Sequence, residues 1–222
     1  MDIEYTPRLK ELKQIIDNRL KGLSNNQRLL VGIYGIPGSG KTTLSLKLKE
    51  HLNQNEEISQ LLPMDGYHLY KSELSQYENS KEMFARRGAH FTFNPSKLLD
   101  LIKKLKSPII ENKNYFAPSF DHSVGDPIEN DIQISPNNKV IIIEGLYLGL
   151  KIDEWTEINS NLDFTWFLDC DKSVCKERLI KRHLASGIEP DEKSAEKRAV
   201  ENDLVNGDFI LNNSRNPDLS IC

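Results

Sequence analysis

Residues 29–43 read Leu-Leu-Val-Gly-Ile-Tyr-Gly-Ile-Pro-Gly-Ser-Gly-Lys-Thr-Thr. The run 29–34 is apolar and long enough for a buried strand, and after Lys41 leucines recur every four residues, as on one face of a helix. Between them, Gly35–Thr42 matches the pattern G-x-x-x-x-G-K-[ST] at every fixed position. A strand, a glycine-rich turn and a helix in this order open a parallel α/β sheet.

The glycine-rich turn has the composition of a phosphate-binding loop. Glycines let the backbone turn tightly with successive N–H groups pointing inward, and the N-terminus of the following helix adds positive potential. Lys41 is expected to reach the β- and γ-phosphates, and the Thr42 hydroxyl to ligate Mg²⁺. A purely structural turn is the alternative, which the match of both motif and context disfavours. The predicted nucleotide-binding residues are Gly35, Ile36, Pro37, Gly38, Ser39, Gly40, Lys41, Thr42 and Thr43.

Strand and helix signals alternate along the rest of the chain, which predicts an α/β fold with a parallel sheet and helices on both faces. One segment departs from this alternation and suggests a β-hairpin insertion at about 109–135. Its strands are expected at 109–120 and 128–134, around Gly125-Asp126-Pro127. The other expected strands are 58–64, 139–145, 164–168 and 219–222, and the other expected helices are 7–23, the stretch from Asn94-Pro95 onward, 172–185 and about 192–206. We divide the chain into an N-terminal helix and linker (1–27) and one domain (28–222).

Composition narrows the class of protein. The 222 residues are 38% hydrophobic and 28% charged, so a packed core is expected and disorder is not. The formal net charge of −4 gives no whole-protein attraction to nucleic acid or to an anionic membrane surface. Three cysteines do not form a disulfide framework, and neither a secretory signal nor a membrane-spanning run is visible. We therefore expect a cytoplasmic protein whose anion recognition is local.

Two acidic residues fall at the ends of predicted strands, where ligands of open α/β sheets bind. Asp65 ends the second predicted strand and Glu144 ends the third. A phosphoryl acceptor needs its hydroxyl oriented and its proton accepted, and Asp65 is our candidate for that role. Glu144 could hold a magnesium-bound water or the substrate. The alternative is that each is a solvated residue at the end of a strand.

Two absent motifs separate small-molecule kinases from other users of a phosphate loop. No N-K-x-D guanine signature is present, because Asn112-Lys113-Asn114 lacks its acidic residue. No apolar run ends in the Asp-Glu pair common in ATP-driven machines. Both absences favour a small-molecule kinase.

A basic helix near the C-terminus suggests a lid at about 176–207. Arg178 and Arg182 are four residues apart and therefore share one helix face, and residues 186–190 then break the helix. Such arginines could close over the nucleotide and stabilise charge on the transferred phosphoryl group. An exposed charged face is the competing interpretation.

The stretch between the two carboxylates is rich in aromatic and polar residues and suits a polar acceptor such as a sugar or a nucleoside. Arg87, Asp121 and His122 are the polar candidates for acceptor binding, together with His68 three residues after Asp65. Most of the aromatic residues are better explained as a minor core under the hairpin.

The order of these features resembles a known family. The phosphate loop, Asp65-Gly66-Tyr67-His68, the hairpin, Ile143-Glu144-Gly145 and the Arg178/Arg182 helix occur in one order over about residues 28–222. That order is similar to the uridine kinase, phosphoribulokinase and type I pantothenate kinase group of P-loop kinases. The resemblance implies ATP with Mg²⁺ as donor, a hydroxyl acceptor, and a general base at Asp65. It also implies that Glu144 helps with metal or acceptor, and it adds Tyr67 to the acceptor side.

Further motifs are closest to a subset of the group, the uridine kinase-like proteins of fungi and bacteria. These motifs are Arg86-Arg87-Gly88 with Phe91-Thr92-Phe93, and Glu201-Asn202-Asp203 with Asn206-Gly207. The chain also departs from uridine kinases, which usually carry Asp-Ser-Phe-Tyr at 65–68 and often Arg-Gly-Arg at 186–188.

The acceptor class therefore stays open among nucleosides, sugars or sugar acids, and pantothenate-like alcohols. A nucleotide-driven ATPase or switch that docks a protein partner on helix 7–23 is the alternative function, and a kinase fold used only for binding is a third reading. The sequence does not specify the oligomeric state.

Overall fold

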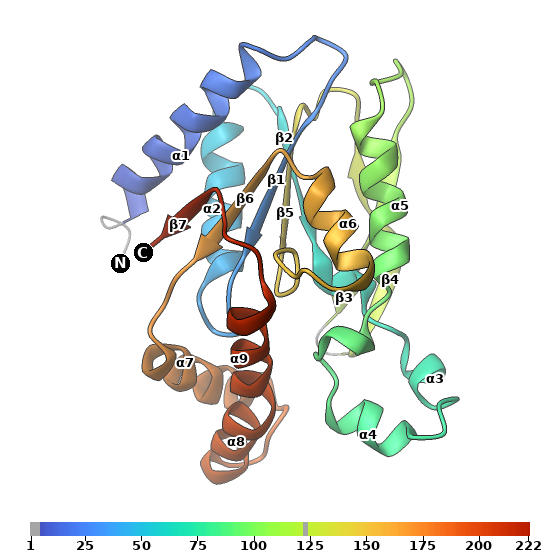
Figure 1. Ribbon diagram of the computed structural model, residues 1–222, viewed down its shortest axis with the longest axis vertical. Helices are drawn as coiled ribbons and strands as arrows, with labels where there is room; N and C mark the ends of the chain where they lie inside the picture. Colours follow the sequence, from blue (N-terminus) through green and yellow to red (C-terminus); the bar gives the residue numbers. More distant parts are fainter. Residues whose placement is uncertain (1–4, 122–123) are drawn as a thin grey trace.

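The computed structural model describes residues 5–121 and 124–222, and its centre is a five-stranded parallel sheet in the order β2-β5-β1-β6-β7 (Figure 1). In register, Leu29 pairs with Val140 and Val31 with Phe164. The predicted parallel α/β sheet is confirmed. Its strands are β1 (Leu29–Tyr34), β2 (Ser59–Pro63), β5 (Val140–Gly145), β6 (Phe164–Leu168) and β7 (Leu219–Ile221).

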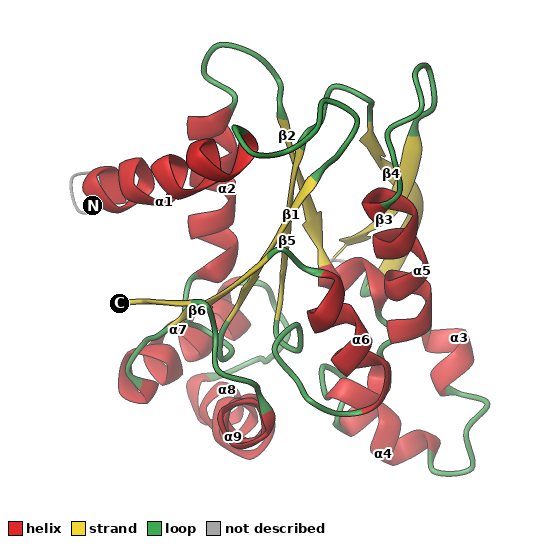
Figure 2. Cartoon of the chain, turned by 45° about the horizontal axis from the view of Figure 1, so that its top comes forward, coloured by secondary structure: helices red, strands yellow, loops and turns green. Residues whose placement is uncertain are grey.

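The central strands are buried on both faces, which explains their continuous apolar sequences. Alternate residues of β1 and β5 point to opposite sides and join two separate core clusters. One cluster packs under α5 (Pro95–Lys106) and α6 (Asp153–Asn161), and the other under α1 (Tyr5–Leu20) and α2 (Lys41–Leu52). Figure 2 shows the two helical layers on opposite sides of the sheet, as the sequence predicts.

Helix α1 is part of the second cluster. Leu12 and Ile16 are fully buried there with Leu44 and Leu48 of α2. The apolar stripe that predicts this helix therefore packs against the domain that follows it. No helix among the described residues is long and apolar enough to span a bilayer.

The hairpin insertion is a separate antiparallel pair, β3 (Tyr115–Asp121) and β4 (Asp126–Ile134). Its first strand begins six residues later than we expected from residue 109. Lys113 N–H donates to the Ile110 carbonyl oxygen in a turn, and Asn112 has a left-handed φ of 61°, so residues 110–113 cannot continue a strand. The predicted acceptor-site residue His122 lies outside the described residues.

The C-terminal helices gather at the carboxyl end of the sheet, beside the short helices α3 (Lys71–Leu74) and α4 (Ser80–Ala85) (Figure 1). Helix α7 spans Lys172–Ala185, as predicted. The next helix was expected to end near Asn206 but runs to Asn213. It consists of α8 (Glu192–Arg198), a π-helical segment η3 (Ala199–Asp203) and α9 (Leu204–Asn213). Two 3₁₀ turns were not expected from the sequence: η1 (Met64–Tyr67) and η2 (His90–Thr92).

Candidate active site

The glycine-rich loop between β1 and α2 is held in a conformation that requires its glycines. Gly38 and Gly40 have φ values of 82° and 95°, in the left-handed region. A Cβ on Gly38 would lie 2.7 Å from the Cys175 carbonyl oxygen of α7, so α7 packs directly on the loop. No side chain caps the N-terminus of α2, and its first N–H groups are therefore placed to meet an anionic ligand.

A hydrogen bond joins this loop to the neighbouring strand. Thr42 Oγ1 donates to Glu144 Oε1 at 3.1 Å, and Glu144 is only 4% exposed. Its second carboxylate oxygen, Oε2, is buried without a hydrogen-bond partner. Burial raises the pKa of Glu144 to about 7, although the charge of Lys41 opposes the rise. A hydroxyl and an unsatisfied carboxylate oxygen are the hard donors that Mg²⁺ prefers, so Thr42 and Glu144 fit that ion.

Lys41 is the electrostatic centre of the site. Burial lowers its pKa below the ordinary lysine value, while Glu144 and Asp65 raise it and Arg182 lowers it. Two carboxylates and two cations from four separate elements therefore act on one another at the carboxyl edge of the sheet. This is the edge at which ligands bind in open α/β folds.

Asp65 was expected to end the second strand, but β2 already ends at Pro63, two residues earlier. Asp65 is the second residue of η1, directly after β2, and is half-buried. His68 N–H donates to the Asp65 carbonyl oxygen at 3.2 Å, and His68 Nδ1 lies 2.8 Å from the same oxygen. That contact selects the tautomer protonated on Nδ1. The turn that carries Asp65 is therefore locked by its own backbone.

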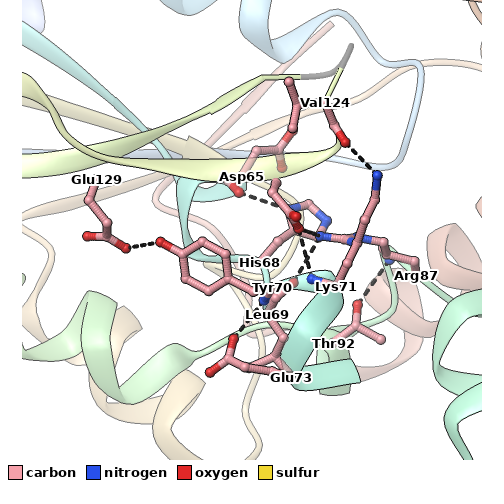
Figure 3. Close-up of polar contacts among 12 residues, drawn as sticks. Asp65, His68, Leu69, Tyr70, Lys71, Glu73, Arg87, Thr92, Val124 and Glu129 are labelled. Carbon is pink, nitrogen blue, oxygen red and sulfur yellow. Dashed lines mark hydrogen bonds and ion pairs between the residues drawn. The ribbon is translucent and has the colours of Figure 1, made fainter. Parts of the chain in front are cut away.

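The hairpin presses against this turn. A Cβ on Gly66 would lie 2.2 Å from the Pro118 carbonyl oxygen of β3. The glycine that replaces the serine usual in uridine kinases is thus required by the close approach of the hairpin backbone. Tyr70 and Lys71 continue the seam, donating to Glu129 and to the Val124 carbonyl oxygen on the hairpin (Figure 3).

The structure brings one lid arginine to the phosphate loop. Arg178 Nη1 of α7 donates to the carbonyl oxygens of Gly38 at 3.4 Å and Ser39 at 3.3 Å. Arg182, one helical turn later, acts on the charge of Lys41. Helix α9 approaches the same loop, since a Cβ on Gly207 would lie 3.3 Å from Ile36 Cβ.

Two residues near Asp65 were expected to bind the acceptor. His68 contacts the rings of Phe93 and Phe120 in tilted geometry, with ring centroids 3.9 Å and 4.6 Å away (Figure 3 shows its position beside Asp65). Tyr67 is 2% exposed and belongs to the core cluster under α5 and α6. Its hydroxyl is buried without a hydrogen-bond partner among the described residues, and its role as an acceptor ligand stays a prediction.

The remaining acceptor candidates lie where η2 meets the hairpin. Arg87 Nη2 donates to the Leu69 carbonyl oxygen at 2.9 Å and to Asp126 Oδ1 at 3.2 Å, which anchors the hairpin. Asp121 ends β3, and its carboxylate accepts a hydrogen bond from the Val124 N–H at 3.3 Å within the hairpin turn. Arg87 and Asp121 thus both contribute to the hairpin's own structure.

Other polar residues of this region have no role predicted from the sequence. Arg86 Nη2 donates to Asn206 Oδ1 at 2.8 Å, and Asn202 Nδ2 to the Arg87 carbonyl oxygen at 3.3 Å. Tyr147, two residues after β5, donates to the Gly88 carbonyl oxygen at 2.6 Å. Asn202 and Asn206 are both buried. Two amides four residues apart in a predicted helix share one face, and this spacing was the sequence signal that could have indicated a buried polar contact.

Comparison with known proteins places this site in a family. The model of the phosphoribulokinase / uridine kinase family matches residues 30–192. The chain belongs to this family. A Schizosaccharomyces pombe relative named "Putative uridine kinase C227.14" is 35% identical over 215 residues, covering 96% of this chain and 91% of the relative.

Solved structures agree with the family assignment. The crystal structure described as a "putative fructose transport system kinase" from Silicibacter sp. TM1040 is 30% identical, has a TM-score of 0.83 and covers 96% of this chain and 98% of its own. YFH7 from Saccharomyces cerevisiae, described as "a putative P-loop containing kinase with a circular permutation", shares the fold. Its TM-score is 0.83 at 21% identity, over 97% of this chain and 98% of that one, which shows a shared fold.

Membership of the phosphoribulokinase / uridine kinase family supports a phosphotransferase that uses ATP and acts on a small molecule. The names of the relatives do not agree on one substrate: one is called a putative uridine kinase and another a putative fructose transport system kinase. The acceptor of this chain must therefore be argued from its own residues.

Proposed function

We propose that this protein is an ATP-dependent kinase that transfers the γ-phosphoryl group to a hydroxyl of a small metabolite. The observation that carries the proposal is the hydrogen bond between Thr42 and the buried Glu144, within the electrostatic reach of Lys41 and Asp65. This arrangement supplies a metal-binding pair, a phosphate-binding ammonium and a carboxylate able to accept a proton, all at one edge of the sheet.

The donor side is built from the phosphate loop. Backbone N–H groups of the phosphate loop, from residues other than Pro37, hold the phosphates, and Lys41 offsets the charge of the β- and γ-groups. Thr42 and Glu144 hold Mg²⁺, which when bound neutralises charge on the phosphate oxygens. Arg178 braces the loop, and Arg182 adds positive charge beside the group in transfer.

The transfer itself requires one proton acceptor. A bond forms between the acceptor oxygen and the γ-phosphorus while the bond from that phosphorus to the β–γ bridging oxygen breaks, so that ADP leaves. Asp65 accepts the hydroxyl proton. The lock on η1 holds this carboxylate in place, because the His68 contact and the Pro118 backbone fix the turn on both sides.

A coupled assay of ADP release tests the proposal. The wild-type protein with Mg-ATP is screened against nucleosides, sugars, sugar acids and vitamin alcohols, beside Lys41→Ala as a loss-of-function control. At least one acceptor is expected to raise ADP release above the rate with water alone, and Lys41→Ala to abolish that increase. A rate stimulated only by a protein partner would replace the proposal with a nucleotide-driven switch. The α1 surface suggested for such docking has its apolar stripe buried against α2.

A further inference from the structure

Within residues 5–121 and 124–222, no acidic side chain forms an ion pair with Arg86. The residue follows α4 and is half-buried. Its guanidinium donates to two neutral oxygens, Asn206 Oδ1 at 2.8 Å and the Glu201 carbonyl oxygen at 3.5 Å. It forms no ion pair with any residue in the described parts of the chain, whereas its neighbour Arg87 is paired with Asp126 at 3.2 Å. A half-buried charge held only by neutral groups keeps an unmet preference for an anion.

Arg86 and the proposed base Asp65 both influence the pKa of Tyr147. The pKa of Tyr147 is raised chiefly by burial, lowered by the charge of Arg86, and raised by Asp65 and Asp203. The geometry also places Arg86 beside the phosphate loop. Its partner Asn206 directly precedes Gly207, where a Cβ would lie 3.3 Å from Ile36 Cβ of that loop. Tyr147 itself is fixed by its hydrogen bond to the Gly88 carbonyl oxygen.

The other groups near Arg86 do not supply the missing negative charge. His90 is stacked on Phe209 of α9 at 4.5 Å, and burial lowers its pKa, so it is neutral at physiological pH. Asp203 is already engaged, since His183 Nε2 lies 2.8 Å from its carboxylate and both side chains are largely buried. Asp153, which acts on His90, is exposed to solvent.

We propose that Arg86 binds an anionic group, a carboxylate or a phosphate, of the acceptor whose hydroxyl is phosphorylated. The inference rests on the proposed function and narrows its acceptor to hydroxylated acids or phosphate esters. A guanidinium binds either group through charge-assisted, often paired hydrogen bonds. Asn206 acts as a positioning residue, because its side chain oxygen orients Arg86 from the lid helix α9.

Matched acceptor pairs test the charge requirement. ADP release by the wild-type protein is compared for glycerate and glycerol 3-phosphate against glycerol, and for gluconate against glucose. At least one anionic member is expected to have a kcat/KM at least about 10-fold above its neutral counterpart, the lower range for one charged hydrogen bond. The two anionic glycerol derivatives distinguish a carboxylate from a phosphate.

Three variants test the residue with the best anionic acceptor. Arg86→Gln is expected to raise the KM for that acceptor by about 10- to 100-fold and to leave the KM for ATP unchanged. Arg86→Lys, which keeps the charge, is expected to recover part of the loss, and it also serves if Arg86→Gln does not fold. Lys81→Gln removes one exposed positive charge from α4, the short helix that Arg86 follows, and is expected to leave both KM values unchanged.

The outcomes separate this inference from the function on which it rests. If neutral acceptors are used as well as their acids, or if Arg86→Gln leaves the acceptor KM unchanged, Arg86 does not recognise an anion and the kinase assignment stands. If the wild-type protein phosphorylates none of these matched acceptors and none of the compounds in the wider screen, the proposed function itself fails.

Discussion

Single residues of the site combine burial with charge. The Glu144 side chain is almost fully buried, and one of its carboxylate oxygens has no hydrogen-bond partner. This arrangement disfavours the charged carboxylate in the ligand-free protein. Positions of this kind are retained for binding at the expense of stability. The strand-end positions of Asp65 and Glu144 could be predicted from the sequence, because strand ends share one edge of a parallel sheet.

Glu144→Gln is expected to stabilise the ligand-free protein at alkaline pH. The folded-state pKa of about 7 lies above the ordinary value of 4.5, so the stability of the wild-type protein falls as pH rises through that interval. Glutamine cannot ionise, and the variant is expected to gain on the order of 2 kcal/mol at pH 8 and nothing near pH 4. Urea unfolding of both proteins at pH 4 and pH 8 measures this gain. The same difference in unfolding free energy at both pH values would contradict the raised pKa of Glu144. The same variant is expected to lose Mg²⁺-dependent turnover.

Asp65→Asn is expected to retain ATP binding and lose phosphoryl transfer. The amide keeps the size of the side chain but cannot accept the hydroxyl proton, which should lower kcat by at least about 10²-fold. Calorimetric titration with Mg-ATP provides the control for intact donor binding. Turnover like that of the wild-type protein would remove Asp65 from the mechanism.

Contacts between elements explain what the sequence did not reveal. Gly207 resembles a helix terminator, yet α9 continues through it. A Cβ there would lie only 3.3 Å from Ile36 Cβ, so the close approach of the phosphate loop favours a glycine at this helical position. The apolar residues Ile109 and Ile110 suggest an earlier strand start, but the left-handed backbone at Asn112 interrupts the extended chain, so β3 begins only at Tyr115. The contact of Arg86 with Asn206 joins residues 120 positions apart, and no local pattern encodes such a pair.

Gly66→Ala tests the packing of the hairpin against η1. The added Cβ would fall 2.2 Å from the Pro118 carbonyl oxygen, so backbone must move, at a cost of about 1–3 kcal/mol. We expect a lower melting temperature and a lower kcat, because Asp65 moves with the turn. Gly22→Ala is the matched control, since its nearest contact is at an ordinary 3.7 Å. Equal melting temperatures for the two variants would argue against a rigid seam.

At the scale of the whole molecule, α1 and the residues after position 28 share one core. The sequence predicts the helix from its apolar spacing, but that spacing does not reveal which surface covers the apolar face. The burial of Leu12 and Ile16 against α2 supplies the answer.

Leu12→Ala is therefore expected to destabilise the entire protein in one transition. Removing a fully buried leucine side chain should lower the free energy of unfolding by about 2–5 kcal/mol. Gln14→Ala changes an exposed residue of the same helix and is expected to have little effect. Calorimetry that shows a separate early transition for α1, with the main transition unchanged, would show that the helix folds apart from the domain.

The π-helical segment 199–203 determines what a single-residue deletion in this helix would do. Its wide turn contains one residue more than an α-turn, and it offers two consecutive side chains to different neighbours, Asn202 to the Arg87 backbone and Asp203 to His183 of α7. A deletion of the exposed Val200 could be absorbed by tightening this turn to an ordinary α-helix. The shortened helix would then lack the extra residue that lets both hydrogen bonds form at once, so α7 and the backbone at Arg87 would no longer be connected through one helical turn.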